Sequence, residues 1–403
     1  MPELNNKIKQ DLLTRLGKMR NYAKNCSYRG YDPYDIMEHP LSRFLFWKKY
    51  PLLLKPLPVL YWRFIWRYPH FSRWLLNIRK QINAKGMGLF ATGYLKLYEL
   101  TGNKEYLEDG EYCLNWLKEH HSEGYSGICW GYPFDWLSFI LIPKGTPSSV
   151  VSTTVGWAFF KHYQLTGEES SLDICKSIAS FLLNDLNIDQ IDNGRICFSY
   201  TPIDNFRVYN ASLMAAEFLL TINSYLNVRS VRELAMKAVA YVIEDQIDDG
   251  SFEYWGQPFR RENHIDCYHT GFVLRSLFHI YNLTGNQQVK KAFEKGLQFF
   301  LDNFFYQGRI PKLKPDRLYP VDIHSVAEAI LSLSQFSGDY PEVLPGLRNV
   351  YEFANKKMWD ERGYYYYRLI GKRKQKIPFI RWSHAWMFRA LSEMLGVVIE
   401  ESS

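Results

Sequence analysis

An internal repeat restricts the fold of this chain more than any other feature. Three apolar runs end in the same tripeptide, Leu-Thr-Gly, and two further runs end in degenerate versions of it. Glycine directly after an apolar run of helical period is a common helix stop. The five endings are Leu100–Gly102, Leu165–Gly167, Tyr225–Asn227, Leu283–Gly285 and Phe336–Gly338. Each run therefore predicts one helix of a repeating unit.

Every one of these runs is followed by a second amphipathic run, which makes the unit a helical hairpin. The first runs cover 89–100, 150–165, 211–226, 271–283 and 326–336. The second runs cover 104–119, 169–186, 229–246, 287–304 and 345–358. A segment with glycine and aromatic residues follows each second run, and we expect these segments to form short extended loops at one end of the array.

The two ends of the chain distinguish a closed ring from an open array. Residues 5–24 and 383–395 each form a helical run without a neighbouring partner. Pairing them would complete a sixth hairpin, whereas an open helical solenoid would leave both apolar faces exposed. We therefore predict an all-α fold, an (α/α)6 barrel with short β-like loops at one mouth. It would form a single domain over residues 1–403.

Positive charge is concentrated near the N-terminus. The net charge is +7, but residues 1–80 hold sixteen Lys and Arg against five Asp and Glu. Because the remaining chain is slightly acidic and has no nucleic-acid-binding motif, we expect no nucleic acid partner.

Residues 26–84 interrupt the repeat as an aromatic and basic segment, here called the clamp. Within it, segment 41–80 has nine Lys and Arg, no Asp or Glu, and eleven aromatic residues. Such a composition is typical of a segment at the surface of an anionic membrane. The alternative is that its rings pack across the barrel while its cations are solvated.

Cysteine usage and the absence of long apolar stretches indicate the compartment. The six cysteines are scattered without a CxxC pair, which predicts no disulfide framework and favours a reducing environment. Residues 1–20 are polar and charged, and no apolar window is long enough to span a membrane. We expect a cytoplasmic protein, with peripheral contact to the inner membrane face if segment 41–80 binds lipid.

Candidate functional residues precede the first helices of the hairpins, in the loops of the predicted mouth. In the segment 129–136, Trp130, Tyr132 and Trp136 offer flat faces for sugar rings, and Asp135 offers a carboxylate. The alternative is a packed aromatic loop in which Asp135 forms a turn.

The loops before the next hairpin, 198–202 and 205–210, add a phenol and a cation. Tyr200 could transfer a proton if nearby cations lowered its pKa. Arg207 could bind a carboxylate, and Asn210 could contact a substrate. A structural tyrosine beside an exposed arginine is the alternative.

Three further helix entrances each contribute histidine. The residues concerned are His264, Asp266 and His269, then Asp322 and His324, then Trp382 and His384. Histidine acting as general acid or base is the preferred interpretation. A zinc site from Asp266, His269 and His324 is an alternative, but the spacings match no zinc motif. Helix capping by the two aspartates is another. We expect no metal and no cofactor.

Basic residues on the same loops indicate an acidic sugar or a nucleotide phosphate as ligand. They are Arg260, Arg261, Lys312, Lys314, Arg317, the run 372–376 and Arg381. The predicted catalytic set is Asp135, Tyr200, His269, Asp322 and His324. The predicted substrate-binding set is Trp130, Tyr132, Trp136, Arg207, Asn210, Asp266, Arg317, Tyr319, Arg381, Trp382 and His384.

Several motifs together resemble the VpsJ-type polysaccharide-biosynthesis family. They are Tyr28–Asp35, Cys129–Asp135, Gly145–Pro147, Phe198–Pro202, His269–Gly271 and Tyr319–His324. The resemblance covers nearly the whole chain and implies a cytoplasmic or membrane-associated protein of exopolysaccharide or surface-glycan synthesis. It implies no catalytic residue. More distantly, the predicted architecture resembles the (α/α)6 barrels of glycosidases, uronate epimerases and lyases.

Two classes of function remain open. A carbohydrate-active enzyme on an acidic glycan could be a hydrolase, which needs two carboxylates ~5 Å or ~6.5–9.5 Å apart, with Asp135 and Asp322 as the candidates. It could also be an epimerase or lyase, which needs a base, an acid and a cation, with His269, Tyr200 and Arg317 as candidates. The other class is a non-catalytic glycan-binding or assembly protein at the membrane. Prenyl transfer or terpene cyclisation lacks the required Asp-rich motif.

Overall fold

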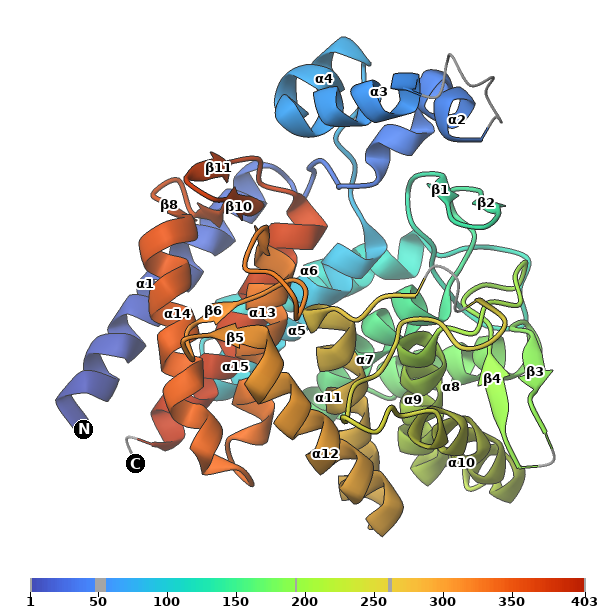
Figure 1. Ribbon diagram of the computed structural model, residues 1–403. Coiled ribbons are helices and arrows are strands. Elements are labelled where there is room, and N and C mark those ends of the chain that lie inside the picture. Colours follow the sequence, from blue (N-terminus) through green and yellow to red (C-terminus); the bar gives the residue numbers. More distant parts are fainter. Residues whose placement is uncertain (1, 48–55, 193, 260–262, 402–403) are drawn as a thin grey trace.

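The computed structural model describes residues 2–47, 56–192, 194–259 and 263–401 (Figure 1). In this part of the chain, six inner helices each contact their neighbours around a closed ring, and α15 contacts α5 to complete it. The inner helices are α5 (Ala84–Thr101), α7 (Ser149–Thr166), α9 (Tyr209–Leu226), α11 (Cys267–Thr284), α13 (Ile323–Phe336) and α15 (Trp386–Glu400). The protein is therefore an (α/α)6 barrel, as the repeat predicts.

The outer layer consists of the second helix of each hairpin. These helices are α6 (Lys104–Glu119), α8 (Glu169–Asn184), α10 (Arg229–Glu244), α12 (Gln287–Phe304), α14 (Leu344–Met358) and α1 (Pro2–Asn25). The inner helices are buried along nearly their whole length, whereas the outer helices bury one stripe and expose charged residues. The core of the molecule therefore lies between and within the two rings.

The repeated Leu-Thr-Gly signals end their helices through the backbone conformation of the glycine. Gly102, Gly167 and Gly285 follow α5, α7 and α11 with φ of 67°, 72° and 67°, in the left-handed region where a side chain is unfavourable. Asn227 takes the same conformation after α9. The degenerate fifth signal differs, because Ser337 is right-handed and the chain continues to a short 3-10 helix at Pro341–Val343.

Closure of the ring is confirmed by contacts between the first and last helices. Helix α1 packs against α15, and the N- and C-termini lie at the same side of the molecule (Figure 1). The Arg348 guanidinium of α14 donates to Asn5 Oδ1 of α1 at 3.1 Å and to Glu401 Oε1 at 2.8 Å. Helix α15 begins three residues later than predicted, because Ile380–Ala385 form a turn of π-helix before it.

Long loops connect each outer helix to the next inner helix, and all of them lie at the end where the inner helices begin. They contain small sheets. The two-stranded pairs are β1 (Trp136–Leu137) with β2 (Leu141–Ile142), β3 (Ile188–Gln190) with β4 (Ile196–Phe198), β5 (Phe305–Tyr306) with β6 (Ile310–Pro311), and β8 (Trp359–Asp360) with β9 (Tyr364–Tyr365). One antiparallel sheet has the order β11 (Arg373–Gln375), β10 (Arg368–Ile370), β7 (Val321–Asp322).

The clamp forms a separate layer above the barrel in the view of Figure 1. It contains the 3-10 helix Asp35–Glu38 and the helices α2 (Pro40–Trp47), α3 (Pro56–Arg67) and α4 (Pro69–Leu75). A small apolar cluster of its own holds it together, with Ile36 and Ile65 fully buried. The Arg73 guanidinium, also fully buried, pairs with Asp35 at 2.8 Å. The Trp66 ring lies against Tyr367, with 5.4 Å between centroids, and so attaches α3 to the barrel.

Two general features complete the description. All six cysteines are free thiols. In the described part of the chain, no helix has the length and apolar character needed to cross a membrane.

Candidate active site

A cavity of about 210 Å³ lies at the mouth where the inner helices begin. Its polar lining consists of Lys85, Asn210, His264, His269, His324 and Arg381. Its aromatic lining consists of Tyr34, Tyr132, Phe134, Trp136, Tyr200, Tyr254, Trp255, Tyr268, Phe272 and Trp382. The residues come from the clamp, the long loops and the first turns of α5, α9, α11 and α13. The mouth therefore combines many aromatic walls with a few basic groups.

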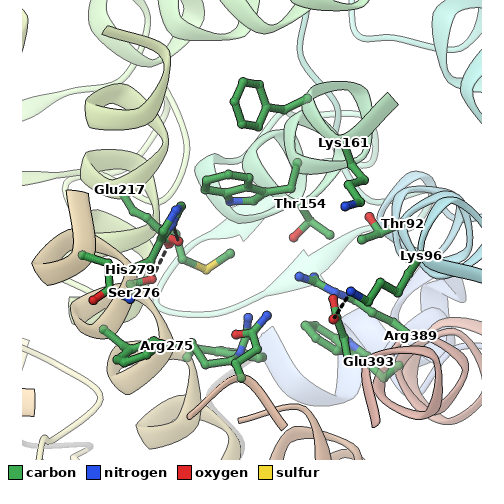
Figure 2. A pocket seen from close by; sticks show the side chains of 18 of the residues that line it. Thr92, Lys96, Thr154, Lys161, Glu217, Arg275, Ser276, His279, Arg389 and Glu393 are labelled. Atoms are coloured by element: carbon green, nitrogen blue, oxygen red, sulfur yellow. Dashed lines mark hydrogen bonds and ion pairs between the residues drawn. The ribbon is translucent and has the colours of Figure 1, made fainter. Parts of the chain in front are cut away.

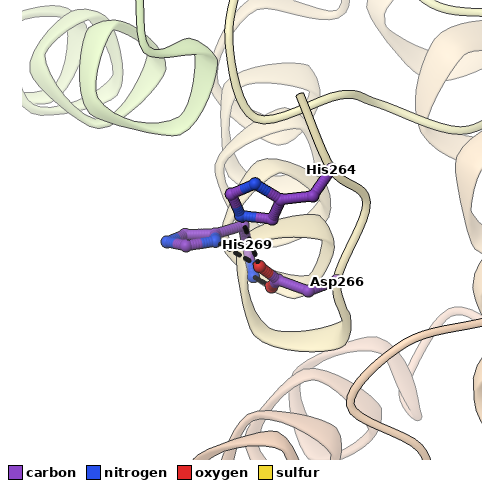
Figure 3. A group of neighbouring side chains, drawn as sticks. All are labelled: His264, Asp266 and His269. Atoms are coloured by element: carbon purple, nitrogen blue, oxygen red, sulfur yellow. Dashed lines mark hydrogen bonds and ion pairs between the residues drawn. The ribbon is translucent and has the colours of Figure 1, made fainter. Parts of the chain in front are cut away.

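His269 is oriented by a carboxylate beneath it (Figure 3). Asp266 caps α11 by accepting from the His269 backbone N–H at 2.9 Å, and its Oδ2 lies 2.7 Å from His269 Nδ1. A carboxylate only accepts hydrogen bonds, so Nδ1 carries the proton and Nε2 has a free lone pair. The ring extends away from Asp266 (Figure 3), so the basic nitrogen is directed away from the carboxylate.

The pKa values of this pair shift in a direction that suits a general base. Burial lowers the pKa of His269, against the opposing effect of Asp266. Burial raises the pKa of Asp266, but the charges and hydrogen bonds of His269 and His264 outweigh it and hold that pKa below its usual value. The imidazole is therefore neutral at pH 7 while the carboxylate is ionised.

His324 lies in the same cavity and has no hydrogen-bond partner for either ring nitrogen among the described residues. It is 2% exposed, and its ring packs between aromatic groups, 4.3 Å from the Trp382 centroid and 4.7 Å from that of Tyr268. Burial and the nearby cations Lys85 and Arg381 lower its pKa well below the usual value. A buried imidazole without partners is unusual and is expected where a ligand supplies them.

Asn210 and Lys85 add two further polar groups to the lining. Asn210 Oδ1 is buried without a donor in the described structure. The Lys85 side chain is 3% exposed, and its ammonium lies 5.5 Å from the Phe272 ring and 5.3 Å from the Trp386 ring. Burial lowers the pKa of Lys85 well below its usual value, and Arg381 adds to this shift. An anionic ligand beside Lys85 would raise that pKa and stabilise its charged form.

Arg381 is the second cation of the cavity and is held in a fixed position. Its guanidinium forms a bidentate pair with Asp32 of the clamp, at 2.6 and 2.8 Å. The same group lies over the Tyr132 ring, 5.0 Å from the centroid. The clamp thus positions one wall of the site.

Tyr200 lines the cavity, but its pKa shifts opposite to the prediction. Burial raises the pKa of Tyr200 well above its usual value, and Arg381 offsets this only in part. Its hydroxyl lies 3.5 Å from that of Tyr132. Tyr200 is therefore a neutral phenol that can donate a hydrogen bond, not a phenolate base.

The two aspartates proposed for hydrolysis do not line the cavity, because both are engaged elsewhere. Asp135 pairs with Arg43 of α2 at 2.8 Å and accepts from the Lys144 backbone N–H. Asp322 is fully buried; it caps α13, accepts from Trp382 Nε1 at 2.9 Å and pairs with Arg368 at 2.6 Å. Asp322 therefore orients a cavity wall, and the capping alternative holds for it.

Five predicted substrate-binding residues also lie away from the cavity. Trp130 is a core residue whose indole donates to the Leu117 carbonyl. Arg207 pairs with Asp189 at 2.6 Å. Arg317 pairs with its neighbour Asp316 and, like Tyr319, is exposed. His384 is fully buried and lies 3.0 Å from the Met19 carbonyl, which fixes the π-helical turn before α15 to α1. Arg260 and Arg261 lie outside the described residues.

The structure brings together His269, His324, Tyr200, Tyr132, Trp136, Asn210, Arg381 and Trp382, with Asp266 directly behind His269. Sequence reasoning missed Lys85, Tyr34, Tyr254 and Tyr268. Lys85 lies in the first turn of the inner helix α5, which also carries Lys96 and Glu99, so its position alone did not mark it. The zinc alternative, which used Asp266, His269 and His324, is not supported in that form. Among the described residues, the possible metal ligands whose atoms all lie within 4.8 Å of one another are His264, Asp266 and His269.

Comparison with known proteins supports the fold. No protein-family model matches the chain, and no curated protein sequence matches it. Cellobiose 2-epimerase from Bacillus thermoamylovorans is similar in structure, with TM-score 0.61 and 11% identity over 80% of this chain and 90% of that one. A D-mannose isomerase has TM-score 0.59 and 13% identity over 78% and 87% of the two chains. An unsaturated glucuronyl hydrolase specific for heparin has TM-score 0.56 and 12% identity over 78% and 86%.

These likenesses establish the (α/α)6 barrel shared by glycosidases, epimerases and lyases. At such low identity they assign no activity to this chain. The narrower resemblance to the VpsJ-type family receives no support from them.

Proposed function

We propose that the protein is an acid–base enzyme that moves a proton at carbon in an acidic sugar unit, as an epimerase or lyase does. The observation that carries this proposal is the pair of neutral imidazoles, His269 and His324, in one cavity with the buried cations Lys85 and Arg381. The names of the similar structures, an epimerase, an isomerase and a glucuronyl hydrolase, are consistent with a sugar ligand.

Proton abstraction is favoured over hydrolysis by the composition of the lining. Glycoside hydrolysis normally requires two carboxyl groups beside the bond that breaks. Among the described residues that line the cavity there is no Asp or Glu. The hydrolase alternative therefore lacks its reacting groups at this mouth.

The residues present suffice for a balanced proton transfer. His269 Nε2 would accept the proton from the carbon next to a carbonyl or carboxylate group, and the electron pair would move to the oxygen. Lys85 and Arg381 would stabilise that oxygen anion. His324 is neutral in the free protein, so it would first take up a proton from solvent as imidazolium; its transfer to the opposite face would give the epimer. Loss of a leaving group from the adjacent carbon, with a proton from solvent, would instead give an unsaturated sugar.

The size and charge of the cavity indicate the substrate class. About 210 Å³ is below the ~300–1,000 Å³ typical of sites for drug-sized ligands, so one sugar residue is the expected occupant. The two cations favour a uronate or another acidic sugar. On the sequence resemblance, we place this reaction in the synthesis of a surface or extracellular polysaccharide in the cytoplasm, and the six free thiols support a reducing compartment.

We further propose that the clamp contacts an anionic membrane. Its helices expose large apolar side chains, with Trp74 71%, Leu60 56% and Phe71 50% exposed, beside the basic residues of segment 41–80. Trp66, by contrast, packs on the barrel as the alternative interpretation predicts. Lys48 and Lys49 lie outside the described residues. Binding to anionic vesicles that is lost at high salt and in Trp74→Ser would support the contact, and no binding at low salt would contradict it.

A substrate screen tests the enzymatic proposal. We would incubate the protein with free uronic acids, neutral aldoses and uronate-containing oligosaccharides, and follow epimers and unsaturated products by proton NMR. Turnover of an acidic sugar that is lost in both His269→Gln and His324→Asn supports the proposal. Tight binding of an acidic sugar without any turnover would instead identify a non-catalytic glycan-binding protein.

A further inference from the structure

A second cavity lies at the opposite end of the barrel, where the inner helices finish (Figure 2). Its volume is about 340 Å³. The lining comes from the middle and later turns of α5, α7 and α11, the middle of α9, the last turn of α13 and the first half of α15. Phe272 lines both cavities and forms part of the wall between them. Neither the candidate active site nor the proposed reaction uses this second cavity.

An unpaired guanidinium faces this cavity. Arg389 of α15 lines it and is only 8% exposed. Within the described residues it has no ion pair or hydrogen bond, and its Nε is buried without an acceptor. Its guanidinium lies near the Trp386 ring, 6.0 Å from the centroid, and the Trp386 indole N–H is also buried without an acceptor. Two buried donor groups therefore lack acceptors beside one cavity.

The other charged groups of the cavity already have partners. Arg275 forms a two-point contact with Glu328, at 2.6 and 3.3 Å. Glu217 accepts from Ser276 at 2.6 Å and lies 2.8 Å from His279 Nδ1. Lys96 and Lys161 both pair with Glu99 at the rim, and Lys96 also lies 4.0 Å from Glu393 of α15, a further residue of the lining. Arg389 is thus the cation in this set that has no ion pair among the described residues, although Glu393, Glu328 and Glu217 act on its charge from further away.

A buried guanidinium without a hydrogen-bond acceptor, such as that of Arg389, is unfavourable for the folded protein. A buried charge without a partner and a buried donor without an acceptor both destabilise the folded protein. Burial lowers the pKa of Arg389 to about 10, and neighbouring Arg275 adds to the shift. The guanidinium nevertheless remains charged at pH 7. A ligand that brings acceptor oxygens would remove the penalty.

We propose that this cavity binds a small organic anion through Arg389 and Trp386. The anionic group, a carboxylate or a phosphate, would accept from both donors, because a guanidinium matches such groups with two parallel hydrogen bonds. The remaining walls contain Trp157, Phe160 and Phe278, so the rest of the ligand would be a flat or apolar ring. The site is distinct from the candidate active site and does not depend on the activity proposed there.

Three probes test the site and separate the two possible anions. Phenyl phosphate and benzoate carry the same ring with a phosphate or a carboxylate, and phenol carries no charge at pH 7. Binding would be measured by isothermal titration calorimetry on the whole protein, together with the shift in melting temperature. We expect at least one anion to bind more than tenfold tighter than phenol and to raise the melting temperature.

Two variants locate the binding. Arg389→Met keeps the bulk of the side chain and removes the charge, so we expect at least a tenfold loss of anion binding, with an unchanged or higher melting temperature in the free protein. His324→Asn, in the other cavity, should leave anion binding intact. The proposal is overturned if no anion binds better than phenol. It is also overturned if Arg389→Met binds as well as the wild type, or if His324→Asn alone abolishes binding. A marked loss of melting temperature in Arg389→Met would likewise oppose it, by showing that the guanidinium already has a stabilising role.

Discussion

The buried histidines are neutral for different physical reasons, and this difference determines what each can do. His269 has a carboxylate on one nitrogen and a free lone pair on the other. Neither ring nitrogen of His324 has a hydrogen-bond partner among the described residues. His384 contacts a backbone carbonyl within the core. The first two can exchange protons with a ligand, whereas His384 can only affect stability.

Asp266 should act as a positioning residue whose loss impairs turnover and leaves the fold intact. In Asp266→Asn, the new side chain still caps α11, because asparagine is as good an N-cap as aspartate. The ionised acceptor of His269 Nδ1–H is lost, and since Asp266 raises the pKa of His269, that pKa falls further. We expect turnover to drop by ~10²-fold or more, and the acidic limb of the pH–rate profile to move to lower pH. An unchanged pH profile would show that Asp266 only caps the helix.

His384 should make the protein less stable in mild acid. Burial lowers its pKa from 6.5 to about 4, so between these values the unfolded chain binds a proton that the folded chain does not. Stability is therefore complete above pH 6.5 and decreases as the pH falls toward 4. From pH 7 to pH 5 the loss due to His384 is about 2 kcal/mol.

Urea denaturation at the two pH values checks this expectation. In His384→Gln, which cannot be protonated, the decrease between pH 7 and pH 5 should be smaller by about that amount. An equal decrease in both proteins would mean that the His384 ring is not held neutral in the folded state.

At the scale of elements, the ring depends on close contact between inner helices. Gly156 lies in the middle of α7, and a Cβ atom built there would be 2.5 Å from the Phe218 ring of α9. Gly17, in the middle of the outer helix α1, has nothing within 4 Å of such an atom. The same substitution should therefore have opposite effects at the two positions.

We expect Gly156→Ala to destabilise the protein by ~1–3 kcal/mol through overpacking. We expect Gly17→Ala to stabilise it by up to ~1 kcal/mol, because alanine favours a helix over glycine. Thermal and urea unfolding of the two variants beside the wild type would show this. A stabilising Gly156→Ala would mean that α7 and α9 are not packed as described.

The helices could be predicted from the sequence because their signals are local. Apolar period, caps and Leu-Thr-Gly stops lie within each run, and the predicted and observed boundaries of α6 and α12 coincide. The roles of Asp135 and Asp322 could not be predicted in the same way. Their loop positions are typical of a functional site, but they pair with Arg43 and Arg368, which are distant in the sequence. Lys85 was missed for the same reason, since its burial depends on α11 and α15.

At the scale of the whole molecule, the barrel has two ends with different character. The end with the long loops carries the clamp and a cavity lined by three histidines, with no carboxylate among the described lining residues. The opposite end has short connections and a cavity with an unpaired arginine. The clamp takes part in the first end directly, because Asp32 holds Arg381. Loss of the clamp should therefore disturb the candidate active site and leave the second cavity unaffected.

The central claim is that the mouth of the barrel abstracts a proton from carbon in an acidic sugar. The most direct measurement is deuterium exchange: the protein is incubated in D2O with D-glucuronate and other uronates, and incorporation at ring carbons is followed by NMR. We expect deuterium at a carbon next to the carbonyl or carboxylate group, at a rate that falls ~10²-fold or more in both His269→Gln and His324→Asn. Cleavage of a glycosidic bond without deuterium at carbon, or exchange that persists in both variants, would contradict it.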